Sequence, residues 1–495
     1  MTTTETMLTS KALPETIFEA DNVFLHFISL IESDVTTYKL GTDISGLNID
    51  TKFTKKENGN FELTFTLKDE DVFDIKYFFI RPVLLLAEGL NILIQNKDVI
   101  GYQQLNISSP EKKCRVEVKA FRGDINDSLW VQSKQGAYFK VNASQFELFN
   151  SGIIFDITTN KDQSSSFKNA VLLNIDESPI LFYFERINDN QGYFIFQTQT
   201  IIDFDKFEKV VNATRAALGL ISGYYMADSV YYISLKKGKG LSGLTYKYIN
   251  INETVKHNYP LIDKAVYNNI SKNELNLNSS QFEELVKLLY KNEEYHRASL
   301  LLITAGSTKG VSKGSLASVA LETISGVVGK NFTSKKIITE KKVNSQLLYE
   351  LRKGLKKTKQ NMTKEQYDLI EAKINHINTI PNAQKLEDSF RLLDIELDEE
   401  ELYCLSCRNK ILHGALPKNK ELNMLTSDEL IFLVSNRLIM LSTMLLLKMA
   451  GYGENVVDWG FTEISKRRAI LRGEKVQGGN AFRKISIKQT LVDEE

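Results

Sequence analysis

Cysteine, proline and histidine are all scarce in this chain of 495 residues. Its three cysteines, Cys114, Cys404 and Cys407, are too few to form a disulfide framework for a chain of this length. Their small number fits a reducing cytosol. The five histidines leave few places where imidazole chemistry can occur.

The chain also lacks net charge, because 62 Lys and Arg balance 62 Asp and Glu. This balance excludes a general basic coat for nucleic acid. The charge is nevertheless segregated along the sequence. Residues 335–364 hold ten Lys/Arg against two acids, 387–401 hold eight acids against one base, and 463–489 hold eight Lys/Arg against two acids. A local RNA-binding surface therefore remains compatible with the composition.

A membrane-targeting pattern is missing as well. The first 21 residues are polar and have no basic start followed by an apolar stretch, so we expect no signal peptide. The most hydrophobic stretch, 430–450, is interrupted by Ser435, Asn436, Arg437 and Lys448. It falls short of the nearly uncharged segment of about 18 residues that a membrane span needs. We therefore expect a buried bundle helix there, and a cytoplasmic protein with no membrane partner.

Two patterns of hydrophobic residues divide the chain. The first half contains short runs rich in β-branched and aromatic residues, such as 61–67, 114–120 and 180–185, separated by Asn, Asp, Gly and Ser. From residue 279 the apolar residues recur with the helical period of 3.6. The predicted fold class is α+β multidomain: a sandwich-like β-rich region followed by an all-α helical bundle. The predicted divisions are a β-rich sensor or regulatory domain over 1–200, a mixed connecting region over 201–278, a helical bundle over 279–455 and a basic tail over 456–495.

One histidine stands in a suggestive setting. Arg408, Asn409 and His413 form an R-N-x-x-x-H pattern near the end of a predicted helix over 398–413, before Gly414. Asn409 and His413 are four residues apart and share a helix face. Arg408 lies about 140° around the axis from His413 and must use its long side chain to converge with it.

Such a trio suits RNA cleavage without a metal. An imidazole can take the proton from a ribose 2′-OH near neutral pH. A guanidinium can hold the phosphate as the 2′-oxygen attacks it. The amide of Asn409 can orient the His413 ring or the phosphate. The expected products carry a 2′,3′-cyclic phosphate or a 3′-phosphate at one end and a 5′-OH at the other.

The pattern Arg408-Asn409-x3-His413-Gly414, in a helical region and followed by a hydrophobic helix, resembles the R-x4–6-H motif of HEPN ribonucleases. The β-rich first half is similar in general layout to the Apea-like HEPN proteins of prokaryotic anti-phage defence. The resemblance implies an endoribonuclease of abortive infection that cleaves host RNA, with tRNA as one candidate substrate. It implies catalytic roles for Arg408, Asn409 and His413 and no cofactor. It also implies a homodimer or higher oligomer through the HEPN domain, and a phage protein as a candidate trigger at the N-terminal region.

Other readings of the same residues stay open. An arginine and a histidine at a helix end are often only capping cations. The alternative function is therefore a catalytically inactive HEPN-like scaffold that recognises a protein or glycan ligand.

Several further residues are candidates for binding. The lysines of the basic segment and of the motif helix could follow an RNA backbone, or simply form a solvated helix face: Lys353, Lys356, Lys357, Lys359 and Lys410. Glu322, on a helix with small residues, could be a buried partner of the Arg408–His413 cluster or part of a structural salt bridge. Cys404 and Cys407 lack two further zinc ligands nearby, so we expect packing residues and no metal site.

Overall fold

The computed structural model forms two compact units, residues Met1–Lys291 and Asn292–Glu495, and each is described here by itself. The part of the chain that the structure describes comprises residues 37–41, 49–56, 60–68, 83–87, 90–105, 111–124, 134–142, 157–160, 167–188, 191–198, 200–223, 225, 229–236, 240–248, 261, 277–332, 337–378, 382–414, 425–472 and 482–485. The sequence also predicts strands at 128–132 and 152–157, and the first of these and most of the second lie outside the described residues.

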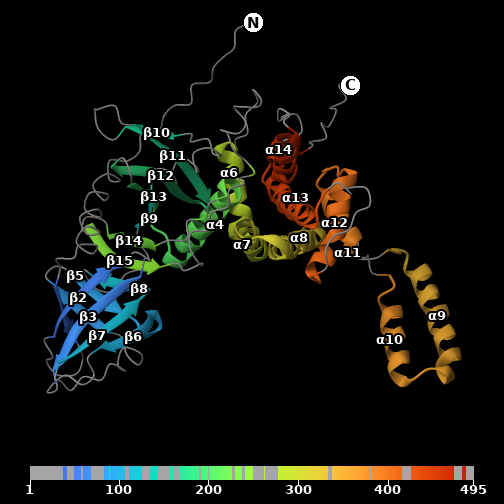
Figure 1. The fold of residues 1–495 in the computed structure, drawn as a ribbon, viewed down its shortest axis with the longest axis horizontal. Helices are drawn as coiled ribbons and strands as arrows, with labels where there is room; N and C mark the ends of the chain where they lie inside the picture. Colours follow the sequence, from blue (N-terminus) through green and yellow to red (C-terminus); the bar gives the residue numbers. More distant parts are fainter. Residues whose placement is uncertain are drawn as a thin grey trace, which may run out of the picture. The chain divides into compact units, whose positions relative to one another are not determined.

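The N-terminal unit is built on one antiparallel sheet (Figure 1). Its strands are β1 (Thr37–Gly41), β2 (Ile49–Lys55), β3 (Phe61–Lys68), β4 (Val83–Ala87), β5 (Leu90–Ile94), β6 (Val99–Leu105), β7 (Glu111–Val118), β8 (Ala120–Asp124), β9 (Lys134–Asn142), β10 (Ile157–Asn160), β11 (Phe167–Ile175), β12 (Ser178–Asn188), β13 (Gln191–Thr198), β14 (Ser229–Lys236) and β15 (Gly240–Tyr248). Their spatial order is β10-β11-β12-β13-β9-β14-β15-β8-β5-β4-β1-β2-β3-β7-β6. A short 3-10 helix, η1 (Asn96–Asp98), precedes β6.

Aromatic side chains fill the core against this sheet. The ring of Phe182 stacks on those of Phe194 and Phe196 from the neighbouring strand, with centroids 5.3 and 4.7 Å away. Phe53, Phe61 and Phe121 form a second buried cluster. Aromatic and β-branched residues therefore do the packing that the alternating sequence pattern predicts.

Two α-helices lie among the described residues of the N-terminal unit. Helix α4 (Phe204–Ser222) begins after Asp203, whose carboxylate accepts hydrogen bonds from the first-turn amides. Helix α6 (Ser279–Lys291) packs on α4 and β11. The region 201–278 was expected to connect two domains, but β14 and β15 are central strands of the sheet. The pairing of β14 with the distant β9 could not be read from local composition.

The C-terminal unit is helical, so the predicted order of a β-rich half followed by a helical half is confirmed. Its elements are α7 (Glu293–Ser307), α8 (Gly310–Phe332), α9 (Lys341–Thr358), η2 (Lys359–Asn361), α10 (Lys364–Asn375), α11 (Asn382–Leu392), α12 (Glu399–Leu412), α13 (Ser427–Met449), β16 (Asn455–Val457), α14 (Trp459–Arg472) and β17 (Phe482–Lys484). The helical period of the sequence predicts one helix over 281–305, but the structure has two helices there, α6 and α7. Asn292 separates them by capping α7 with its side chain.

Helices α8 and α13 form the centre of this unit. Helix α8 contacts α7, α11, α12 and α13. Helix α13 is apolar on nearly all sides and buried along most of its length, as the sequence predicted. By length and composition it is also the one helix among the described residues that could cross a membrane, but 94% of its apolar window is buried inside the protein.

Helices α9 and α10 form an antiparallel hairpin that is mostly exposed (Figure 1). Leu355 is the only buried side chain of α9, and Ile374 the only one of α10. The amide of Asn378, just after α10, bonds the backbone of Ile338, just before α9. The base of the hairpin is thus closed by an amide side chain, while most of its surface faces solvent.

The segment 456–495 was expected to be a basic tail, but its described residues include part of β16, all of α14 and β17. Strands β16 and β17 pair with each other, and α14 packs on α13. The guanidinium of Arg483 on β17 binds the carboxylate of Glu401 on α12, with Nε 2.6 Å from Oε1. At least one of the basic residues of this segment is therefore an internal salt-bridge partner.

Candidate functional site

Helix α12 carries the Arg408-Asn409-x3-His413 pattern between two well-formed ends. Asp398 and Glu401 form a capping box at its start. His413 is the C-cap, and Gly414 follows with φ of +71°, a left-handed conformation that glycine adopts at low cost. The helix therefore ends where the sequence predicted, and it places His413 at its last turn.

Arg408 points into the protein. Its side chain is 3% exposed, and its Nη2 lies 2.9 Å from Oε1 of Glu322 on α8. The same Nη2 donates to Oδ1 of Asn409 at 2.6 Å. The other terminal nitrogen, Nη1, is buried and has no hydrogen-bond partner within the described residues. The structure thus brings Arg408, Asn409 and Glu322 together, but Glu322 is 42% exposed and so is not a buried partner. The buried guanidinium keeps unused hydrogen-bonding capacity.

Asn409 and His413 are both exposed, on the same side of α12. Because the Oδ1 of Asn409 accepts from Arg408, its Nδ2 amide group is left as the outward donor. Arg408 therefore orients the Asn409 amide. The three residues therefore differ in exposure: Arg408 is a buried cation, Asn409 an exposed amide bonded to it, and His413 an exposed imidazole. Among the described residues, the His413 side chain makes no hydrogen bond to either of the other two.

The start of α8 lies against the end of α12. The Ser315 hydroxyl is 3.4 Å from the carbonyl oxygen of Ile411. A methyl group added to Gly314 would lie 2.9 Å from a side-chain carbon of Ile411 and 2.8 Å from the hydroxyl oxygen of Ser435 on α13. Only glycine allows α8 to approach both neighbours this closely. The last turn of α12, which carries His413, is therefore packed against the start of α8.

Lys313, one residue earlier, is a polar residue that the sequence reasoning missed. Its side chain is 5% exposed, and its Nζ donates to Oδ1 of Asn436 at 2.7 Å. Burial lowers the pKa of Lys313 to about 8. The ring of Phe432 lies 5.6 Å from the same Nζ. A lone lysine in an otherwise small and apolar helical segment was the signal that could have drawn attention to it.

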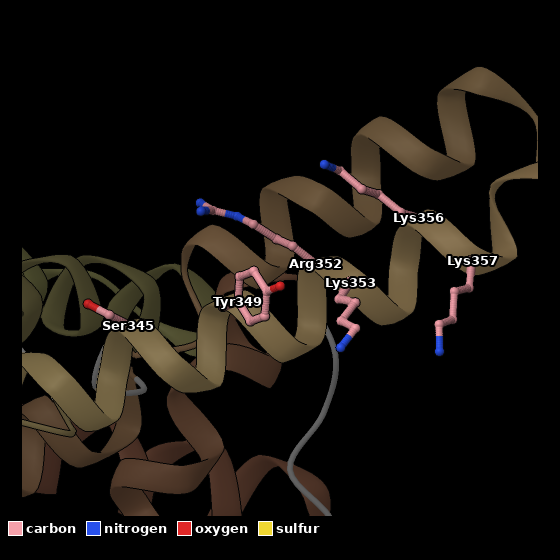
Figure 2. Close-up of a pocket in the computed structure, with 6 residues that line it drawn as sticks. All are labelled: Ser345, Tyr349, Arg352, Lys353, Lys356 and Lys357. Atoms are coloured by element: carbon pink, nitrogen blue, oxygen red, sulfur yellow. The ribbon is translucent and has the colours of Figure 1, made fainter.

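The predicted RNA-contacting lysines lie on separate elements. Lys353, Lys356 and Lys357 line a surface hollow on α9 (Figure 2). Lys359 begins η2 and lies over the ring of Tyr367, 5.3 Å from its centroid. Lys410 is exposed on α12, next to Asn409. Three of the five predicted lysines therefore share one surface on α9, whereas Lys359 and Lys410 lie on other elements.

Cys404 and Cys407 are buried and free. Burial is the main cause that raises the pKa of both thiols, which disfavours the reactive thiolate. The expectation that they are packing residues is compatible with this environment. Among the described residues, no group of three or more His, Cys, Asp or Glu is placed to hold a metal ion.

No protein-family model, no curated protein and no solved structure matches the chain.

Proposed function

We propose that this protein is a metal-independent endoribonuclease of the HEPN type that acts in abortive infection against phage. The observation that carries the proposal is the set Arg408, Asn409 and His413 at the end of α12, in which the imidazole is exposed and the guanidinium is buried and bonded to Asn409. An exposed His413 is free to meet a substrate, which a buried one would not be.

In the proposed reaction, His413 removes the proton from a ribose 2′-OH. The 2′-oxygen then attacks the adjacent phosphorus, the bond to the 5′-oxygen breaks, and the leaving oxygen takes up a proton to become a 5′-OH. The outward Nδ2 of Asn409 donates to a phosphate oxygen that gains charge in the transition state. Arg408, at 3% exposure, acts through Asn409 as a positioning residue.

The proposal includes an assembly. A single exposed imidazole supplies one proton-transfer group, whereas cleavage by 2′-OH attack uses both a base and an acid. A second copy of α12 across a two-fold axis would supply the other group. We therefore propose a cytoplasmic homodimer that forms through the helical unit, with the N-terminal unit as the sensor of infection and a phage protein as its trigger.

The test is RNA cleavage by the purified protein and by His413→Ala. Loss of a general base typically costs about 10²- to 10⁴-fold in rate. His376→Ala is the matched control, because His376 is also an exposed histidine at a helix C-cap, that of α10. We expect His376→Ala to cleave like wild type, and the wild-type products to carry 2′,3′-cyclic phosphates with or without chelator. Full cleavage by His413→Ala, or dependence on a divalent metal, would overturn the proposal.

The burial of Arg408 favours one alternative, a scaffold without catalysis. In that case the Arg408–Glu322 pair is only a structural salt bridge that joins α12 to α8. Wild type and His413→Ala would then both leave RNA uncleaved, and the substitution would leave cellular protection unchanged. Substitutions on the surface of the N-terminal unit would abolish function instead.

A further inference from the structure

Helix α9 has an exposed surface that its own packing does not explain. It is 18 residues long, and only Leu355 is buried. A helix with so little buried apolar surface gains little stability from tertiary contacts. Its exposed residues are therefore free to serve a partner.

Six residues of α9 line the hollow on this surface (Figure 2): Ser345, Tyr349, Arg352, Lys353, Lys356 and Lys357. Figure 2 shows Arg352 and Lys356 extending from one side of the helix, and Lys353 and Lys357 from the other. The set spans about 18 Å along the helix axis, at about 1.5 Å per residue. None of the six is acidic.

The cations of this hollow repel one another. Arg352 and Lys356, and likewise Lys353 and Lys357, are like-charge pairs four residues apart, a spacing that destabilises a helix. Among the described residues, no carboxylate lies within salt-bridge distance of Lys353, Lys356 or Lys357. A polyanion laid along the helix would remove this repulsion.

An aromatic ring lies among these charges. The side chain of Tyr349 is 62% exposed, and the Nζ of Lys353 is 5.8 Å from its ring centroid. An exposed ring costs free energy in water, and a ring flanked by cations is the arrangement on which a base stacks while neighbouring phosphates are neutralised. Arg352 is held by a 2.7 Å hydrogen bond to Asn375 on α10, which stiffens the hairpin at this point.

We propose that this face of α9 binds a single-stranded stretch of RNA, with a base on Tyr349 and phosphates on Lys353, Lys356 and Lys357. The inference rests on the proposed function only in naming RNA as the substrate class. It places a binding surface on an element separate from α12. An acidic protein segment would satisfy the charges but would leave the ring of Tyr349 without a stacking partner.

The test measures binding of a 20-nucleotide single-stranded RNA by fluorescence anisotropy at several salt concentrations, in the His413→Ala protein so that RNA stays intact. The triple variant Lys353→Gln, Lys356→Gln, Lys357→Gln should bind more weakly. The slope of log affinity against log salt should fall by about 2, at about 0.7 per phosphate contact for a single strand. Tyr349→Leu should weaken binding about tenfold, as expected from loss of one stacked base, and should leave the salt slope unchanged.

The matched control is the triple variant Lys342→Gln, Lys364→Gln, Lys373→Gln. It removes the same charge from exposed positions of the same hairpin that do not line the hollow. An equal loss in this control would show only nonspecific attraction and overturn the inference, as would poly-glutamate competing as well as RNA. Circular dichroism of each variant should show the helix content of the wild type. If wild-type cleavage depends on His413 while the α9 variants bind RNA normally, the RNA-binding role of α9 fails and the proposed function stands. If the α9 variants lose RNA binding while His413→Ala cleaves fully, the proposed function fails and the RNA-binding role of α9 stands.

Discussion

At the scale of single residues, Lys313 shows most clearly how the fold alters side-chain chemistry. An ammonium group loses its hydration when it is buried, and the hydrogen bond that Lys313 donates to Asn436 does not offset this loss. The folded state therefore favours the neutral amine, and the pKa falls from the usual 10.5 to about 8. Between these two pH values the unfolded chain binds more protons than the folded one.

This difference predicts a pH-dependent stability. The free energy of unfolding should gain about 3 kcal/mol from Lys313 as the pH rises from below 8 to above 10.5, because the burial cost of the charge disappears. Urea unfolding of wild type and Lys313→Met at pH 7 and pH 10 checks this. The stability of wild type relative to the variant should improve at pH 10. A difference between the two proteins that is the same at both pH values would contradict the assignment.

At the scale of the element, α12 is held most firmly at its first turn. The carboxylate of Glu401 is 1% exposed, binds Nε and Nη2 of Arg483, and accepts from the backbone amide of Asp398. The neighbouring Glu400 binds Nη1 of Arg437 at 2.6 Å, and Asp458 binds Nε of the same arginine at 3.1 Å. Segments from three parts of the chain thus converge on the start of the helix, while its far end presents His413.

Glu401→Ala should therefore destabilise the helical unit by about 3 kcal/mol, since it removes the carboxylate that neutralises a partly buried Arg483. Glu399→Ala is the control, because Glu399 is exposed in the same turn, and should cost no more than about 0.5 kcal/mol. Urea unfolding followed by circular dichroism measures both. Equal effects of the two substitutions would show that the Arg483 contact contributes no special stability.

At the scale of the whole molecule, the chain has two units with separate cores. Phe182 is fully buried in the N-terminal unit, and Leu441 is fully buried in α13 of the helical unit. Either side chain leaves a cavity when cut to alanine, at a cost of about 2–5 kcal/mol. Scanning calorimetry should show two transitions, of which Phe182→Ala lowers one and Leu441→Ala the other. If both substitutions shifted a single common transition, the units would not unfold independently.

Much of the element-level structure could be predicted from the sequence, because its signals are local. The capping box of Thr426 and Glu429 marks the start of α13, and Gly414 marks the end of α12. The break at Asn292 was missed because the apolar period continues across it. The place of β14 beside β9 was missed because strand pairing joins residues almost 100 positions apart.

In the candidate site too, some features follow from the local sequence and others from long-range packing. Local sequence is enough to predict which residues belong to one helix, that Asn409 and His413 share a face, and that α9 is basic, because helical geometry and charge depend on near neighbours. The packing of distant segments sets the inward turn of Arg408 to Glu322, the exposure of His413 and the burial of Lys313 against Asn436. Burial and ion pairing depend on which distant segments pack together. Two neighbours in sequence, such as Arg408 and Asn409, can therefore have opposite exposures and different roles.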